Sequence, residues 1–350
     1  MTNIKIFISY KDKHQIIKSE IFQPIQTGRA IANKIFPNMI GDDTGDNIST
    51  ENPKYNELSA QYWVWKHYQE IGEPDYIGFM HYRRHFIFDN SIDLSNKKTW
   101  LPKSHIYRFN SIHDCDYANN LSSDLINASI ADNSDCIVLK PYDVKFLLPN
   151  NIYMKEHYLN TIPGAKRINF ETFYDVISEL YPEYNEVLNE FTYGSNMYLC
   201  NMFIMKKDLF FEYSKFCFDI LSEIDKRIDS SDYKGEELRF LGFLGEYLLS
   251  IFVLKLQKNK QIKIKYLNGS LIENPDNANL SKNFKNLYQS IFSITNIDDH
   301  KLITILGLKI KYKNRSNKEL EKKLDILTNK VTELQKELII YKYQEKKDEH

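Results

Sequence analysis

Three aspartates lie close together in the polar segment at residues 41–53. The segment reads GDDTGDNISTENP and places Asp42, Asp43 and Asp46 within five residues. Carboxylate oxygens are the ligands that Mg²⁺ prefers, and they also bind ribose hydroxyls. We therefore expect a site for Mg²⁺ or Mn²⁺ or for a ribose. The alternative is a capped turn whose Asp and Asn side chains accept hydrogen bonds from backbone amides.

A cationic cluster follows the apolar segment at residues 75–79. This segment, DYIGF, predicts a strand, and His81, Arg83 and Arg84 come directly after it. Arginine is planar and permanently charged, so it suits the oxygens of a diphosphate. The alternative is a structural ion pair with one of the loop aspartates. His81 and His85 lie four residues apart without an evident third ligand, so zinc is poorly supported.

One carboxylate is placed in strongly apolar surroundings. Glu246 lies within FLGFLGEYLL at residues 240–249. Burial raises the pKa of a carboxyl group, which suits a general base. The alternative is a glutamate paired with Arg239 or another cation. Glu57 is a second acidic candidate, although its place near the start of a predicted helix also fits an interaction with the helix dipole.

The elements that must position these residues follow one another as strand, helix and strand. IKIFISY at 4–10 predicts the first strand, and isoleucines at roughly helical spacing predict a helix over 16–35, kinked at Pro24. A helix over 55–68 and the strand at 75–79 follow. This order predicts an α/β fold, in which ligands bind beyond the carboxyl ends of strands. We expect the chemistry in three segments there: 10–14, 42–47 and 81–85.

The second half of the chain is predicted to be richer in helices. The apolar patterns predict two strands, two helices around Pro182 and two long helices. These elements are expected at residues 136–140, 198–206, 170–189, 208–228 and 235–256.

The composition excludes several classes of protein. The 350 residues suffice for one large domain or two smaller ones, and the net charge of -1 argues against a general nucleic-acid binder. The chain has 12 glycines and neither a GxGxxG nor a P-loop motif, which leaves little for a glycine-cradled phosphate site. Four cysteines without a CxxC pair predict reduced thiols in a cytoplasmic protein, and the N-terminus turns polar too soon for a signal peptide. The apolar stretch at 241–256 is too short for a membrane span.

The C-terminal part changes character. Residues 316–350 carry apolar residues at alternating spacings of four and three, which predicts a coiled-coil helix and a homodimer, with a helix folded back on its own domain as the alternative. Residues 300–315 interleave Leu and Ile with Lys and Arg. This segment is expected either to contact an anionic membrane surface peripherally or to form an edge hairpin with solvated lysines. We therefore divide the chain into three parts: a domain at 1–270, a connecting segment at 271–315 and the helix at 316–350.

Five motifs, taken in order, resemble a known family. They read GDDTGDNIS, ENPKYNELSAQYWVWKH, DYIGFMHYRRHF, NMFIMKKDLFFEY and RFLGFLGEYLL. The chain resembles over roughly residues 3–256 the DUF4422 family of bacterial glycosyltransferases of capsular polysaccharide and lipopolysaccharide O-antigen synthesis. The resemblance implies a GT-A-like, Rossmann-type fold. It also implies transfer of a sugar from a UDP-sugar, with galactose in pyranose or furanose form as a plausible case, to a hydroxyl of a growing, lipid-linked glycan.

The resemblance also implies roles for individual residues. GDDTGDN and HYRR are expected at the donor, although HYRR stands where GT-A enzymes carry a DxD metal motif. The three aspartates would bind Mn²⁺ or Mg²⁺ if the enzyme uses a metal, whereas the arginines would replace the metal if it does not. Expected catalytic residues are Glu246, Arg83 and Arg84. Expected donor-binding residues are Tyr10, His14, Asp42, Asp43, Asp46, Asn47, His81 and Tyr82.

Two other functions remain open from the sequence. One is a non-catalytic assembly protein that presents an inactive α/β domain on a coiled-coil dimer of a polysaccharide synthesis complex. It predicts no UDP binding and tolerance of Arg83→Ala. The other is a metal-dependent hydrolase or phosphotransferase built on the aspartate loop.

Overall fold

The computed structural model contains two compact units, residues 1–278 and 279–350. The boundary lies beyond the predicted one at 270, because the strand Gly269–Ile272 belongs to the sheet of the first unit. Side chains are described only in the first unit. The structure describes residues 2–12, 15–114, 117–130, 133–147 and 153–275, and the backbone of 292–297, 300–305 and 308–313.

The first half of the sheet is parallel. β1 (Ile4–Tyr10) lies between β2 (Phe22–Gln26) and β4 (Tyr76–His81), and β3 (Ile40–Gly41) extends the edge beside β2. β1 is buried at every position except Lys5, as expected for a strand with parallel neighbours on both sides. The strands predicted at 4–10 and 75–79 are confirmed, and so is the α/β class.

The second half of the sheet contains a reversal. β10 (Phe203–Lys206) is antiparallel to both β4 and β7 (Cys136–Leu139), and β11 (Ile264–Leu267) is parallel to β7. The order is β11-β7-β10-β4-β1-β2-β3. Shorter strands complete the unit: β5 (Arg84–Phe86), β6 (Ile106–Phe109), β12 (Gly269–Ile272), β8 (Tyr142–Asp143) and β9 (Asn196–Met197).

The helix predicted over 16–35 is wrong. This segment contains β2 and a 3-10 turn at Arg29–Ile31. Pro24 is accommodated in β2 because it precedes the two residues, Ile25 and Gln26, that pair with β3. Its missing N–H therefore leaves no bond to β3 unmade. Ile25 is buried within β2, whereas Ile31 and Ile35 are exposed, so the isoleucines of this segment do not form one buried helical face.

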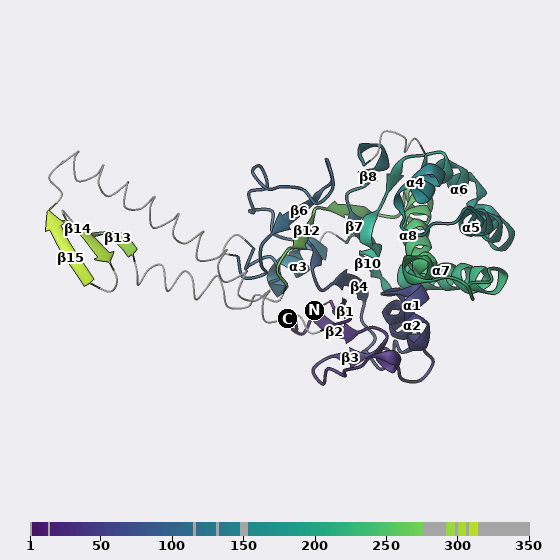
Figure 1. Ribbon diagram of the computed structural model, residues 1–350, viewed down its shortest axis with the longest axis horizontal. Coiled ribbons are helices and arrows are strands. Elements are labelled where there is room, and N and C mark those ends of the chain that lie inside the picture. Colours follow the sequence, from purple (N-terminus) through teal and green to yellow (C-terminus); the bar gives the residue numbers. More distant parts are fainter. Residues whose placement is uncertain are drawn as a thin grey trace. The chain divides into compact units, whose positions relative to one another are not determined.

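The helices α4 to α8 gather on one side of the sheet (Figure 1). α7 packs on β4 and β10, and α8 packs on α7 and α6. The predicted helices at 55–68, 170–189, 208–228 and 235–256 are confirmed. The helices are α1 (Asn52–Tyr55), α2 (Leu58–Lys66), α3 (Ser123–Ile130), α4 (Met154–Thr161), α5 (Arg167–Leu180), α6 (Asn185–Thr192), α7 (Lys207–Arg227) and α8 (Phe240–Lys258).

The segment Gly235–Lys258, which includes α8, is long and apolar enough to cross a membrane. However, 72% of its most apolar window is buried inside the protein. Core helices of globular domains have this composition because they are covered on all sides. We therefore describe α8 as the central helix of the first unit.

The second unit contains a three-stranded antiparallel sheet. Its strands are β13 (Phe292–Ile297), β14 (His300–Ile305) and β15 (Leu308–Lys313). The basic segment predicted at 300–315 therefore forms the hairpin of β14 and β15. The coiled coil predicted at 316–350 lies outside the described residues.

Candidate functional site

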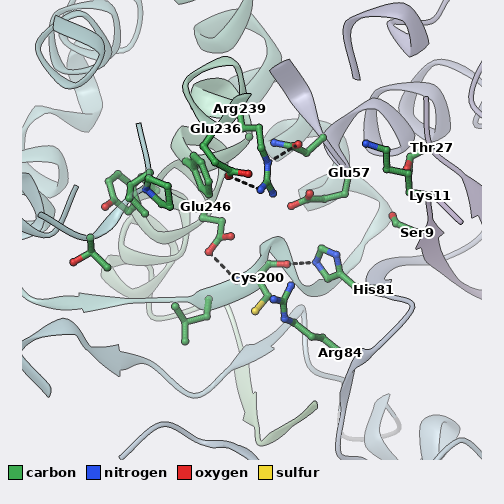
Figure 2. A pocket seen from close by; sticks show the side chains of 18 of the residues that line it. Ser9, Lys11, Thr27, Glu57, His81, Arg84, Cys200, Glu236, Arg239 and Glu246 are labelled. Carbon is green, nitrogen blue, oxygen red and sulfur yellow. Dashed lines mark hydrogen bonds and ion pairs between the residues drawn. The ribbon is translucent and has the colours of Figure 1, made fainter. Parts of the chain in front are cut away.

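A cavity of about 830 Å³ opens at the carboxyl ends of the parallel strands. Ser9 lies near the end of β1, Thr27 follows β2, and His81 ends β4; all three line it with Lys11. Figure 2 shows Ser9, Lys11 and Thr27 gathered on one side of the cavity. Parallel strands end at the same edge of a sheet, so three segments distant in sequence meet here. Lys11 belongs to the predicted segment 10–14 and His81 to the predicted segment 81–85, whereas no residue of the predicted segment 42–47 lines the cavity.

One face of α8 forms another wall. Gly242, Phe243, Glu246 and Tyr247 line the cavity, spaced at three to four residues as one helical face requires. Gly242 allows a close approach to the turn before α2, because a Cβ at this position would lie 2.0 Å from Asn56 Nδ2. α8 thereby brings Glu246 near the strand ends.

The third wall is a turn that precedes β10. Cys200 and Asn201 both have left-handed backbones, with φ of 73° and 47°, which is uncommon for two consecutive non-glycine residues. The Cys200 N–H donates to Glu246 Oε2 at 3.0 Å, and the Cys200 carbonyl accepts from His81 Nε2. Asn201 Nδ2 donates to Glu57 Oε1 at 2.9 Å. One strained turn therefore contacts three ionisable residues of the site, as strained backbone at functional sites often does.

Glu246 has the proton affinity of a general base. Its pKa is raised to about 7, mainly by burial and also by the charge of Glu57, against the opposing effects of the Cys200 N–H, Arg84 and Arg239. Arg239 does not neutralise it directly, because its guanidinium donates to Glu236 at 2.7 Å and to Asn56 at 3.1 Å. The structure therefore does not contain the Glu246–Arg239 ion pair that was the alternative interpretation. A carboxylate with this pKa can accept a proton near neutral pH.

The raised pKa of Glu246 predicts a pH-dependent stability. Between about pH 4.5 and about pH 7 the folded state holds a proton that the unfolded state has released, so the free energy of unfolding falls as pH rises through this window. The full effect is roughly 3 kcal/mol. Glu246→Gln should remove this pH dependence. In urea titrations, the free energy of unfolding of the variant relative to that of the wild type should therefore increase from pH 5 to pH 8. Parallel pH curves for the two proteins would contradict the assignment.

His81 is a neutral donor in this site. Burial lowers its pKa, and the charges of Arg84 and Arg83 act in the same direction, against the opposing effects of Glu57 and the Cys200 carbonyl. Because a carbonyl only accepts, His81 Nε2 carries the proton. His81 is thus fixed at the end of β4 by the same turn that holds Glu246.

Arg83 and Arg84 both line the cavity, and Tyr82 lies beside them. The Arg84 guanidinium lies 4.5 Å from the centre of the Trp100 ring, and its buried Nε has no hydrogen-bond partner. Among the described residues no carboxylate forms an ion pair with either arginine; the loop aspartate Asp43 pairs instead with Arg29, at 2.7 Å. Two cations without a protein counter-ion can bind an anionic ligand.

The aspartate loop does not face this cavity. Asp42 is fully buried and accepts from the Gly28 and Arg29 amides at 2.8 and 3.0 Å, and from the Ser49 and Ser59 hydroxyls at 2.6 and 2.7 Å. These four donors occupy the carboxylate, so its oxygens are not available to a cation. Asp42 therefore caps a turn, which was the alternative interpretation of this loop.

The other residues of this loop are also engaged elsewhere. Asp43 pairs with Arg29, Asp46 accepts from the Tyr62 hydroxyl at 2.9 Å, and Asn47 accepts from the Ser49 amide at 3.1 Å. The described ranges contain no cluster of three His, Cys, Asp or Glu side chains that could hold a metal ion. The structure does not bring Asp42, Asp43 and Asp46 together as the predicted metal site.

This placement predicts effects of very different size for two loop aspartates. Asp42→Ala should lower the free energy of unfolding by about 3 kcal/mol, because four buried donors lose their acceptor. Asp46→Ala, which breaks a more exposed contact, should cost less than about 1 kcal/mol. Urea unfolding with and without EDTA measures both. A large loss for Asp46→Ala, or an EDTA effect that Asp42→Ala abolishes, would favour the metal site instead.

Tyr10, a further predicted donor residue, is not in the cavity lining. Tyr10 is fully buried, and its hydroxyl accepts from the Ile17 amide at 3.0 Å and donates to the Gln15 carbonyl at 3.1 Å. Burial raises the pKa of Tyr10 to about 12, so it is a neutral structural group. His14 lies outside the described residues.

The cavity lining and the turn that supports it include residues outside the predicted set. Glu57 was weighed only as a candidate, and Asn201 carries no sequence signal, because its importance comes from a contact between residues 144 positions apart. Lys11, Thr27 and Trp100 were missed as well. The break in the apolar pattern of the segment at 198–206 is the one feature that could have indicated the turn.

Comparisons with known proteins agree with this architecture. The sequence profile of DUF4422, described as a domain of unknown function, matches residues 5–260. The apo structure of WbbM, a bifunctional glycosyltransferase, is similar at a TM-score of 0.70 and 32% identity over 78% of this chain. This chain covers 46% of that one, so it spans about half the length of the solved structure. No curated protein matches significantly. The profile match includes the strand ends, the Cys200–Asn201 turn and the Glu246 wall, and the chain belongs to the DUF4422 family.

Proposed function

We propose that the protein is a glycosyltransferase that moves a sugar from a nucleoside diphosphate sugar to a hydroxyl of a growing surface polysaccharide. The observation that carries the proposal is one cavity in which no carboxylate of the described residues pairs with Arg83 or Arg84 and in which Glu246 has a pKa of about 7. Similarity to a bifunctional glycosyltransferase supports it. The proposed donor is a UDP-sugar, with galactose as the first sugar to test, and the proposed acceptor is a lipid-linked capsular or lipopolysaccharide glycan.

The proposed reaction is a direct displacement with inversion. The acceptor hydroxyl gives its proton to Glu246 as its oxygen forms a bond to the anomeric carbon of the donor. The bond from that carbon to the diphosphate oxygen breaks, and its electron pair leaves with the nucleoside diphosphate. Arg83 and Arg84 stabilise the negative charge that develops on the departing group.

Thermal unfolding of the full chain with UDP, GDP, CMP and dTDP, each with and without Mn²⁺, tests the proposal. A ligand that binds only the folded state adds about 2.7 kcal/mol at a hundredfold excess over its dissociation constant. We expect a shift with UDP. If no nucleotide shifts the transition and Arg83→Ala leaves the function of the synthesis complex intact, the non-catalytic assembly protein becomes the better account.

We further propose that the enzyme works as a dimer at the cytoplasmic face of the membrane. The lysine-rich hairpin of β14 and β15 and the heptad pattern at 316–350 support this arrangement. Lys309, Lys311 and Lys313 follow one another at alternate positions of β15. Their joint replacement by Ser should release the chain from vesicles that contain anionic lipids. Equal sedimentation of both proteins, or a monomer in light scattering, would refute the corresponding part.

A further inference from the structure

Glu57 is a carboxylate of the cavity that the reaction above does not use. It is the residue just before α2, where its side chain makes no capping hydrogen bond, and it lines the cavity with His81 and Glu246. Figure 2 shows its carboxylate between Glu246 and the group formed by Ser9, Lys11 and Thr27. Its charge acts on both His81 and Glu246, which is consistent with this central position.

Glu57 is held by a hydrogen bond rather than by a cation. Asn201 Nδ2 donates to Oε1 at 2.9 Å, and the described part of the chain supplies no other hydrogen-bond partner to the Glu57 side chain. Within the same part of the chain, no Lys or Arg lies at ion-pair distance from it; Arg239, on the neighbouring wall, pairs with Glu236. The second carboxylate oxygen therefore keeps its capacity to accept hydrogen bonds from a ligand.

Glu57 lines the same cavity as Arg83, Arg84 and Glu246. In the proposed reaction the diphosphate binds near Arg83 and Arg84, and the acceptor hydroxyl binds near Glu246. The sugar that moves must lie between these groups, and its ring presents hydroxyls, which are hydrogen-bond donors. A carboxylate that lacks a counter-ion is a strong acceptor for such donors.

We propose that Glu57 binds ring hydroxyls of the transferred sugar and that Asn201 is the residue that positions it. This inference rests on the proposed function. Asn201 is 3% exposed, and its left-handed backbone directs its amide at Glu57. Asparagine is one of the few residues other than glycine that adopt this conformation readily, so position 201 combines a backbone requirement with a side-chain donor.

The test compares the affinity for a UDP-hexose with the affinity for UDP alone. Calorimetry on the full chain first identifies the tightest-binding member of a panel of UDP-hexoses that includes both ring forms of galactose. Glu57→Gln should weaken binding of that UDP-hexose roughly 10- to 100-fold, because a hydrogen bond to a charged group is lost. It should leave the affinity for UDP unchanged. Glu51→Gln, in the 3-10 turn just before α1, is the matched control and should change neither affinity.

Two variants separate the positioning role of Asn201 from a structural one. Asn201→Gly keeps the left-handed backbone without strain, whereas Asn201→Ala does not, so only the alanine variant should lower the melting temperature. Both should lose the preference for the UDP-hexose over UDP. Asn133→Gly replaces another left-handed asparagine, at an exposed turn, and should keep that preference.

The outcomes distinguish this inference from the proposed function. If the wild type binds a UDP-hexose and Glu57→Gln binds it equally well, Glu57 does not contact the sugar and only the inference fails. If Glu57→Gln weakens UDP and UDP-hexose by the same factor, its role is structural and the inference is again overturned. If Asn201→Gly keeps the full preference for the UDP-hexose, the positioning role is refuted. If the wild type binds no nucleotide of the panel, the proposed function fails and the inference fails with it.

Discussion

Glu246→Gln should lower the rate of sugar transfer about a thousandfold. The amide keeps the size of the side chain and a hydrogen-bonding oxygen, but it cannot take the proton of the acceptor hydroxyl. The wild-type rate should rise with pH through about 7 as Glu246 loses its own proton, and the residual rate of the variant should lack this transition. Initial rates from pH 5.5 to pH 8.5 measure both effects.

The Glu246→Gln variant should fold, because the removal of a buried ionisable group is expected to stabilise the protein at high pH. Glu51→Gln again serves as the control for the loss of one negative charge. A Glu246→Gln rate within tenfold of the wild type would show that another group accepts the proton. An unchanged pH profile would lead to the same conclusion.

Arg84→Ala should lower kcat by roughly two to three orders of magnitude, the range found when a group that stabilises transition-state charge is lost. Arg84 lines the cavity and forms no ion pair with any carboxylate that the structure describes, so its loss leaves the departing diphosphate less neutralised. Arg84→Lys should recover part of the rate, since it keeps the charge but not the planar fork. Steady-state kinetics with a saturating acceptor separate kcat from KM.

Arg108→Ala is the matched control for this experiment. Arg108 lies in β6 and pairs with Glu273 at 2.7 Å, and it is not in the cavity lining. Its replacement should leave kcat unchanged. If Arg84→Ala is as active as Arg108→Ala, the leaving group is stabilised elsewhere in the cavity.

The elements that could be predicted from the sequence are those that are apolar throughout because neighbouring elements cover both of their faces. β1 and β4 stand in the middle of the sheet, and their continuous apolar runs identified them as strands. The apolar patterns of α7 and α8 continue over more residues than a strand contains, so they identified both segments as helices. β2 was missed because five residues with a central proline are too few for a periodic signal, and because flanking isoleucines imitated a helix.

The candidate site was predicted where it depends on strand ends and missed where it depends on long-range pairing. His81 is the last residue of β4, and Arg83 and Arg84 come just after it, so one strand prediction placed all three. Asn201 reaches Glu57 only because β10 returns antiparallel to β4, a topology that no local pattern contains. The prediction of a metal site in the aspartate loop failed for a related reason. The composition of the loop does not reveal that the hydrogen-bond partners of Asp42 are amides and hydroxyls.

The most direct test of the account is the anomeric configuration of the transferred sugar. Proton NMR of wild-type reactions, run with the UDP-hexose that binds tightest and an acceptor glycan, follows the donor and the product together. The account predicts UDP release and a product of inverted configuration, with both lost in Glu246→Gln. A product of retained configuration would contradict direct displacement with Glu246 as the base, and no consumption of any donor in the panel would contradict glycosyl transfer itself.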